Sequence, residues 1–301
     1  MIVRWLVSGP GRSVEDDPRL LSCGPIVRNL THAGTCGRPF RGVPHSGIEI
    51  AVLGPATVRG SPQPFRRPAA LELAVYLAFH RRAVRHAEWS LAIWPDQPVA
   101  LSTVHSTCSD CRRALGSARD GALHLPRGVK LQLRDTVTTD VDHFASLTGS
   151  GDALRAMHLV RGPLFAGLRR TDWAVFDGTQ SQIESLVVRT ALAGAYEAIG
   201  GGRGEEAEWI VRQALRVSPY DERLYRSLLR ATAAEGNRLG LRSTMAELLT
   251  LAGEAERPGN RLPGVVRRDG TGLECLHPRT TALYRGLLQG SPAAGGHPAR
   301  L

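Results

Sequence analysis

The residues with the clearest chemical potential are polar and basic side chains between positions 102 and 130. Arg112 and Arg113 are adjacent, and arginine donates forked hydrogen bonds that fit both phosphates and the edge of guanine. Hydroxyls at a helix start also suit a phosphate, because backbone N–H groups point outward there. This chemistry is typical of nucleic-acid binding, and the candidate DNA contacts are Ser102, Thr103, His105, Ser106, Ser109, Arg112, Arg113, Arg127 and Lys130.

Most of these candidates depend on one helix, predicted over residues 101–115. Ser102 or Thr103 is expected to cap its start, and Gly116 to end it. This helix has an apolar face whose residues follow one another at spacings of 4, 3 and 4: Val104, Cys108, Cys111 and Leu115. With this face turned inward, the candidate contacts of the helix point outward.

A structural role competes with DNA binding at two of these positions. Arg112 and Arg113 near a helix C-terminus interact favourably with the helix dipole by ~0.3–1 kcal/mol without any DNA. Asp110 adds a negative charge beside the outward face. Further candidates for phosphate contact lie outside this helix, at Arg66, Arg67 and Arg85.

The cysteines do not indicate a metal or redox site. Cys108 and Cys111 fall on the apolar face of a helix, and no second pair lies at zinc spacing, so we expect two buried small side chains. The first 47 residues hold an irregularly spaced set that we also expect not to bind metal: Cys23, His32, Cys36 and His45. We therefore predict neither a metal nor a cofactor.

Catalytic motifs are not found either. Lys130 is the only lysine, and Leu131 follows it, so the sequence holds no Walker A phosphate loop. Neither His-Glu-x-x-His nor Gly-x-Ser-x-Gly occurs. We expect the protein not to be an enzyme and assign no catalytic residues.

Composition bounds the remaining options. The 301 residues suffice for two domains, and 42% of them are hydrophobic. Basic residues outnumber acidic ones 38 to 28, a balance that permits nucleic-acid binding without proving it. No apolar run reaches the ~18 residues of a membrane span. Five unevenly spaced cysteines do not form a secreted disulfide framework, so we expect a cytoplasmic protein.

The segment around the predicted helix has the order of a winged helix-turn-helix. Alternating apolar residues from Ile48 to Val58 predict strands, and helices are expected from Pro68 and over 86–94. After the helix at 101–115, two short alternating runs at 122–125 and 129–133 predict a hairpin, which would be the wing.

The rest of the chain is predominantly helical. Helices are predicted over 152–161, 172–199, 205–217, 221–235 and 239–252. Gly202-Arg203 matches Gly236-Asn237, and Ala214-Leu215 matches Leu248-Leu249, both at a period of 34 residues. That period is typical of tetratricopeptide repeats.

These patterns predict a mainly α protein with a small β component, in which a winged helix-turn-helix precedes tetratricopeptide-like repeats. Residues 253–275 read as a basic loop before a closing helix. The expected division is a flexible leader (1–47), a DNA-binding winged helix (48–145), a helical repeat domain (146–290) and a flexible tail (291–301).

Several short motifs, taken in order, resemble a known pair of modules. Ile50-Ala-Val-Leu-Gly-Pro, Trp94-Pro-Asp, Cys111-Arg-Arg-Ala-Leu-Gly and Val141-Asp-His-Phe are similar to SARP-type bacterial regulators. The stretches 162–168, 172–174, 219–225, 276–278 and 281–285 resemble their partner module, the bacterial transcriptional activator domain (BTAD). The resemblance covers roughly residues 48 to 290.

This resemblance implies a transcriptional regulator, expected to be an activator, that binds double-stranded DNA; the residue types themselves do not distinguish activation from repression. The helical module would then serve regulation, homodimerisation or contact with RNA polymerase. The alternative is a protein-interaction scaffold whose helical repeats bind a partner and whose winged helix binds DNA weakly or not at all. The neutral middle of the chain, with 13 basic and 14 acidic residues over 146–256, favours this alternative.

Overall fold

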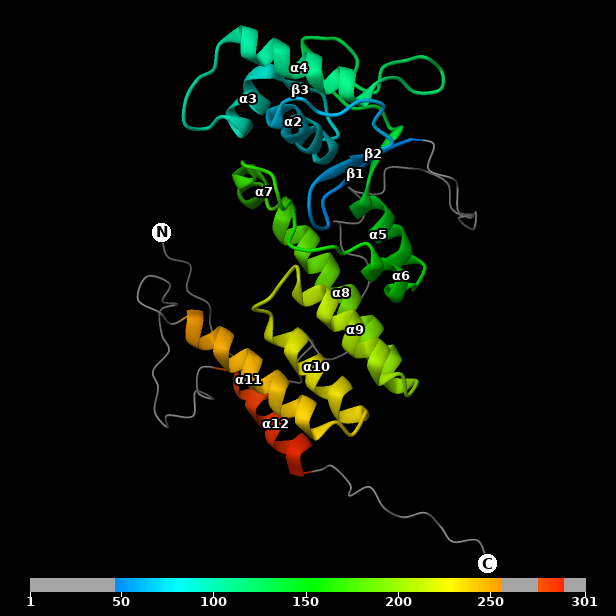
Figure 1. Ribbon diagram of the computed structural model, residues 1–301, viewed down its shortest axis with the longest axis vertical. Coiled ribbons are helices and arrows are strands. Elements are labelled where there is room, and N and C mark those ends of the chain that lie inside the picture. Colours follow the sequence, from blue (N-terminus) through cyan, green and yellow to red (C-terminus); the bar gives the residue numbers. More distant parts are fainter. Residues whose placement is uncertain (1–46, 256–275, 290–301) are drawn as a thin grey trace, which may run out of the picture. The chain divides into compact units, whose positions relative to one another are not determined.

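The computed structural model describes residues 47–255 and 276–289, which all fall in one compact unit, 37–301 (Figure 1). The fold is mainly helical with a small β component, and a winged helix precedes helical repeats, as predicted. Some predictions fall outside the described residues: the leader up to residue 46 with its Cys23, His32, Cys36 and His45, most of the loop 253–275, and the tail 291–301.

A three-stranded sheet and three helices make up most of the first module. β1 (Ile48–Ala51) pairs antiparallel with β2 (Thr57–Arg59), as the alternating pattern predicts. On its other edge β1 pairs in parallel with β5 (Val137–Thr139), which the sequence pattern did not reveal. The helices, close to their predicted ranges, are α2 (Pro68–Phe79), α3 (His86–Ile93) and α4 (Leu101–Leu115).

The predicted hairpin between residues 122–125 and 129–133 is wrong. β4 (Lys130–Leu131) pairs antiparallel with β3 (Val84–Arg85), which comes just before α3. Residues 122–125 form no strand with 129–133: the His124 N–H donates to the Gly116 carbonyl at the end of α4 (3.1 Å), and one backbone bond, from the Arg134 N–H to the His124 carbonyl (3.0 Å), closes the loop between them. The part of the predicted wing that extends into solvent is the exposed run 126–130, which we call the wing loop.

Three helices, α5 to α7, precede the repeats, which begin with α8. α5 (Asp140–Gly149) starts with a capping box, in which the Thr139 hydroxyl accepts from the Asp142 N–H (3.0 Å) and the Asp142 carboxylate accepts from the Thr139 N–H (2.8 Å). α6 spans Ala153–His158. The single helix predicted over 172–199 is divided into α7 (Asp172–Phe176) and α8 (Thr179–Gly200), because Gly178 is left-handed with φ 80°.

The 34-residue period corresponds to two successive helix pairs. α8 pairs with α9 (Gly204–Leu215), and α10 (Glu222–Ala234) pairs with α11 (Arg238–Ala255), while α12 (Pro278–Gln289) packs against α10 and α11. Gly202 and Gly236, 34 residues apart, both have positive φ in the turn within each pair. The buried faces of α9 and α11 correspond at the same offset: Ala207, Ile210, Val211 and Ala214 match Leu241, Thr244, Met245 and Leu248.

The segment 160–166, which we call the junction segment, fastens the repeats to the winged helix. The Arg161 N–H donates to the Leu53 carbonyl (2.6 Å), and the Phe165 N–H donates to the Val52 carbonyl (3.0 Å). Gly54 leaves room for this contact, since a Cβ at that position would lie 2.7 Å from the Cβ of Arg161. With φ 144° Gly54 also has a backbone conformation that favours glycine.

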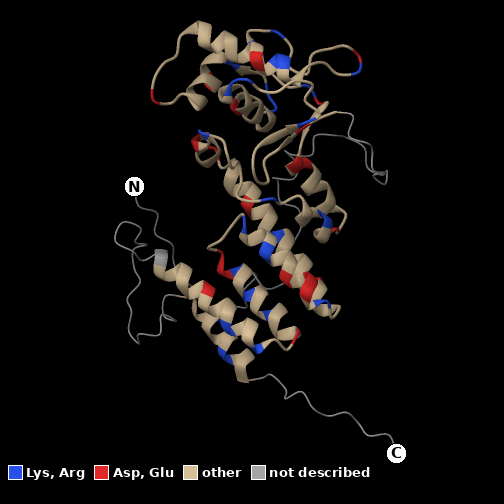
Figure 2. Ribbon diagram, viewed as in Figure 1, with Lys and Arg blue, Asp and Glu red and all other residues tan. Residues whose placement is uncertain are grey.

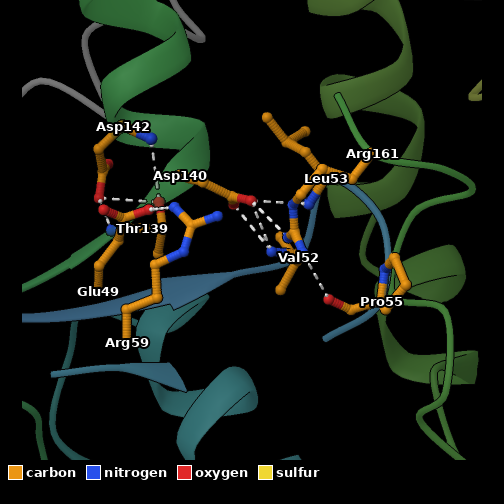
Figure 3. A network of polar contacts seen from close by, with 9 residues as sticks. All are labelled: Glu49, Val52, Leu53, Pro55, Arg59, Thr139, Asp140, Asp142 and Arg161. Carbon is orange, nitrogen blue, oxygen red and sulfur yellow. Dashed lines mark hydrogen bonds and ion pairs between the residues drawn. The ribbon is translucent and has the colours of Figure 1, made fainter. Parts of the chain in front are cut away.

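Asp140 is the polar centre of this contact (Figure 3). Its buried carboxylate accepts from the N–H groups of Val52 (2.8 Å) and Leu53 (3.0 Å) and from the Arg161 guanidinium (3.3 Å). Burial raises the pKa of Asp140, and these donors act in the opposite direction. The first residue of α5 thus connects the end of β1 to the junction segment.

Helix α2 is held to the same part of the repeats by aromatic and ionic contacts. Tyr76 meets Trp173 edge to face with ring centres 5.1 Å apart, and Phe79 meets Phe165 at 5.7 Å. The buried carboxylate of Glu72 accepts from the Arg169 backbone N–H (3.1 Å) and guanidinium (3.2 Å). Since α4 packs on α2, the helix with most of the candidate contacts rests on an element that the repeats help to fix.

Candidate nucleic-acid interface

The inward face of α4 is the predicted one. Val104, Cys108, Cys111 and Leu115 are all buried. Burial raises the pKa of the Cys108 and Cys111 thiols, so both stay protonated near neutral pH. Within the described residues, no group of three or more His, Cys, Asp or Glu residues is placed to hold a metal ion.

The start of α4 differs from the prediction. The helix begins at Leu101 with Ala100 as its N-cap residue and has no side-chain cap, so Ser102 and Thr103 lie inside the first turn rather than at the cap. Ser102 is exposed and Thr103 is half-buried. An uncapped helix start presents backbone N–H groups, which is the arrangement that suits a phosphate oxygen.

The outward face of α4 carries the predicted polar residues at different depths. His105 and Ser109 are exposed and one helical turn apart, whereas Ser106, Arg112 and Arg113 are half-buried. The Ser106 hydroxyl donates to the Thr103 carbonyl (3.0 Å), so its donor is already used. His105 and Ser109 therefore have the freest side chains of this face.

Asp110 has a structural role that the sequence analysis missed. Its carboxylate is buried and accepts from the backbone N–H groups of Arg66 (3.0 Å) and Arg67 (2.9 Å), which lead into α2. It also forms an ion pair with Arg113, one turn along α4. Asp110 thus places its charge inside the module instead of beside the outward face, and it holds Arg113 there.

Arg112 belongs to a different set of neighbours. The His86 ring lies 6.1 Å from the His105 ring, centre to centre, which brings the start of α3 next to the exposed face of α4. Burial lowers the pKa of His86, and the nearby His105 and Arg112 lower it further. His86, His105 and Arg112 therefore form a cluster in which the neighbouring groups add to the effect of burial and disfavour protonation of His86.

The sheet end beside this cluster adds two more cations. Arg85 lies directly opposite Lys130 in the β3–β4 pair, and His86 follows Arg85 in the chain. Like charges placed opposite each other destabilise a strand pair unless a ligand neutralises them. Both side chains are exposed, as is Arg127 in the wing loop. No acidic side chain of the described residues forms an ion pair with Lys130.

The fold therefore brings some of the predicted DNA contacts close together, and it engages one of them, Arg113, in an ion pair within the module. His105 and Arg112 on α4 lie next to His86, and Arg85 and Lys130 lie at the neighbouring sheet end. Arg113 is bound to Asp110. Figure 2 shows basic and acidic residues side by side near the C-terminal end of α4. Arg66 and Arg67, predicted as phosphate contacts, have exposed side chains at the entrance to α2.

The comparisons with known proteins bear on both modules. Residues 147–239 match the family model described as "bacterial transcriptional activator domain". No curated protein sequence matches the chain. Among the described helices, none is both long and apolar enough to cross a membrane.

A solved structure has a similar fold. Mycobacterium tuberculosis EmbR, determined in complex with a low-affinity phosphopeptide, superposes with a TM-score of 0.53 at 21% sequence identity. The match covers 81% of this chain and 66% of the EmbR chain, just under two thirds of its length. The chain thus contains a bacterial transcriptional activator domain in its helical part, and its resemblance to SARP-type bacterial transcriptional regulators is confirmed.

Proposed function

We propose that the protein is a DNA-binding transcriptional activator that reads an operator with the helix 101–115 (α4) and with the predicted wing region 122–134. The observation that supports this most is the cluster of basic side chains that the fold gathers around α4, where Glu88 is the acidic neighbour of Arg85. Arg85 and Lys130 oppose each other at the sheet end, and His86 and His105 lie beside Arg112. DNA phosphates would neutralise this cluster.

Within this proposal the candidate contacts have different roles. His105, Ser109 and Arg112 face the base edges in the major groove, and Ser102, Thr103 and Ser106 lie near the phosphates at the start of the helix. Arg127 and Lys130 contact the backbone or the minor groove from the wing. Arg113 contributes least to base reading, since its guanidinium already binds Asp110.

The helical repeats supply the regulatory part of the proposal. They would contact RNA polymerase or a second copy of the chain, and the protein would act in the cytoplasm without a catalytic step. The rival function is a protein-interaction scaffold with little or no affinity for DNA. The engagement of Arg113 by Asp110 favours this rival, since it removes one cation from the reading face.

Selection of bound fragments from a random pool of duplex DNA tests the proposal. We expect a recovered motif whose affinity falls with salt, by ~0.9 in log K per tenfold change for each phosphate contacted. Arg112→Ala should then weaken binding by ~1–3 kcal/mol. Arg155→Ala, which removes an exposed arginine from α6, is the matched control and should bind as the wild type does.

Two results would contradict the proposal. One is a selection that enriches no sequence, and the other is equal binding by the Arg112 and Arg155 variants. Either result would favour the scaffold function.

A further inference from the structure

A tight turn that is not among the predicted DNA contacts follows the C-terminal end of α4. The Gly121 N–H donates to the Ala118 carbonyl (2.9 Å), and the Ala118 N–H donates to the Ala122 carbonyl (2.8 Å). Residues 118–121 therefore form a β-turn that backbone hydrogen bonds close. Arg119 is the second residue of this turn and is exposed. We call residues 118–121 the arginine turn.

The acid of the arginine turn is already bound. The Asp120 carboxylate accepts from the Ala122 backbone N–H (3.0 Å) and, through both oxygens, from the Arg134 guanidinium (3.2 and 3.0 Å). The hydrogen bonds from Arg134 lower the pKa of Asp120, so this carboxylate is ionised and its charge is matched by Arg134. Arg119 itself forms no ion pair with any residue that the structure describes. Its guanidinium is therefore not engaged by the acid next to it.

The arginine turn and the wing loop are attached to the same base. The backbone of Arg134 is bound to His124, and His124 is in turn bound to Gly116, where α4 ends. The side chain of Arg134 holds Asp120 of the turn. Arg134 thus connects the arginine turn to the end of α4 and to the wing, which are the two elements proposed to touch DNA.

The position of the turn suits a phosphate beside the major groove. Consecutive Cα atoms are 3.8 Å apart, so the Cα of Arg119 lies within ~11 Å of the Cα of Gly116. The major groove that admits a helix is ~12 Å wide, and the phosphates of the two strands border it. With α4 in this groove, Arg119 lies past the helix end, where the bordering backbone runs, rather than over the base edges. Arginine donates paired hydrogen bonds to phosphate.

We propose that Arg119 binds a DNA phosphate at the border of the groove that α4 enters. This inference rests on the proposed function, because it assumes that α4 and the wing face DNA. It adds a contact that positions the protein on the duplex and carries no sequence information of its own.

Salt titrations on two duplexes test this contact. One duplex holds the motif recovered by the selection, and the other is an unrelated duplex of the same length. Arg119→Ala should lower the slope of log K against log salt by ~0.9 on both duplexes and weaken binding to each about fivefold at ~0.15 M salt. Arg119→Lys keeps the charge and should keep most of the slope. Arg155→Ala, which removes the same charge from α6, is the matched control and should leave the slope unchanged.

Two outcomes would overturn the inference and leave the proposed function standing. One is a salt slope for Arg119→Ala equal to that of Arg155→Ala, and the other is a loss confined to the selected motif, which would indicate a base contact. The reverse case is also distinguishable. If the wild type enriches no motif but Arg119→Ala still lowers the slope on the unrelated duplex, sequence reading fails and the phosphate contact is supported. Circular dichroism should show that the variants are folded, because Arg119 is exposed.

Discussion

Helices α2 and α12 begin in the same way, although they belong to different modules. Each has proline at its first position, and the N–H of the residue before that proline is bound by a carboxylate from a neighbouring helix. Asp110 of α4 binds the Arg67 N–H, and Glu222 of α10 binds the His277 N–H. Proline lacks an N–H of its own, so this bond helps to fix the direction in which the chain enters the helix.

We call the Asp110 and Glu222 carboxylates, which hold these two helix starts, the first and the second anchor. They differ in what else they bind. Asp110 also pairs with Arg113 on its own helix, whereas Glu222 also binds the uncharged Thr280 hydroxyl. One outward arginine of α4 is therefore held in a direct ion pair, while Arg226 of α10 is linked to the Glu222 carboxylate only through the Thr280 hydroxyl.

Removal of the first anchor should have the largest effect. Asp110→Ala leaves two backbone N–H groups and a half-buried guanidinium without their acceptor, so we expect the free energy of unfolding to fall by ~2–4 kcal/mol. Urea denaturation followed by circular dichroism measures this. Asp120→Ala, which removes an exposed acid paired with Arg134, is the control and should have a much smaller effect. Equal losses would show that Asp110 is not an anchor.

Removal of the second anchor should cost less, because Glu222 is only half-buried. We expect Glu222→Ala to lower the free energy of unfolding by ~1–2 kcal/mol. The change should be concentrated in α12, where hydrogen exchange of the Thr280 and Thr281 amides should accelerate most. Exchange that accelerates uniformly across the repeats would contradict a local anchor.

The arginines themselves should separate the two regions further. Arg113→Ala removes a partly exposed ion-pair partner, while Asp110 keeps its two backbone N–H donors, so we expect a loss of ~1 kcal/mol in the free energy of unfolding. Arg230→Ala removes an exposed side chain that forms no ion pair with the residues that the structure describes, and it should stay within ~0.5 kcal/mol of wild type. Thermal and urea unfolding of both variants check this, and the reverse order would refute the assignment of their partners.

The smallest expected effect is a dependence of the free energy of unfolding on pH, which arises from His86 beside α4. The pKa of His86 is lowered below 6.5 by burial and by His105 and Arg112, so the folded state favours the neutral ring. Its contribution to stability is complete above about pH 6.5 and is lost as pH falls through the lowered pKa. His124, whose pKa is lowered by burial and Arg134, acts in the same direction.

Unfolding measured between about pH 5 and 7.5 tests this dependence. His86→Gln should reduce the slope of the free energy of unfolding against pH, and adding His124→Gln should reduce it further. Slopes identical to wild type in both variants would contradict the assignment.

Local periodicity predicted those parts of the fold that depend on neighbours in the sequence. The inward face of α4 follows from the spacing of Val104, Cys108, Cys111 and Leu115, and the 34-residue period identified the paired repeats. The start of α5 was missed although Thr139-x-x-Asp142 carries a capping signal. That signal is present in the sequence, but it precedes an apolar pattern too short to stand out.

Contacts between distant residues were not predictable in this way. The pairing of Lys130 with Arg85 depends on a two-residue strand 45 positions earlier, and a strand that short has no alternating pattern. Asp110 was read as a surface charge because its donors, the N–H groups of Arg66 and Arg67, lie more than 40 residues away. For the candidate interface, the sequence indicated which helix carries the predicted contacts. It did not indicate that one of the two arginines of this helix, Arg113, forms an ion pair with Asp110.

The junction segment sets how this protein can be divided. Val52 and Leu53 at the end of β1 give their carbonyls to Phe165 and Arg161, and Gly54 makes the close approach possible. A fragment that ended at residue 145 would lose these donors and would uncover the aromatic rings of α2. A boundary for dividing the protein into fragments therefore lies after residue 166 rather than at residue 145, because the first module ends only where Phe165 has bonded to Val52.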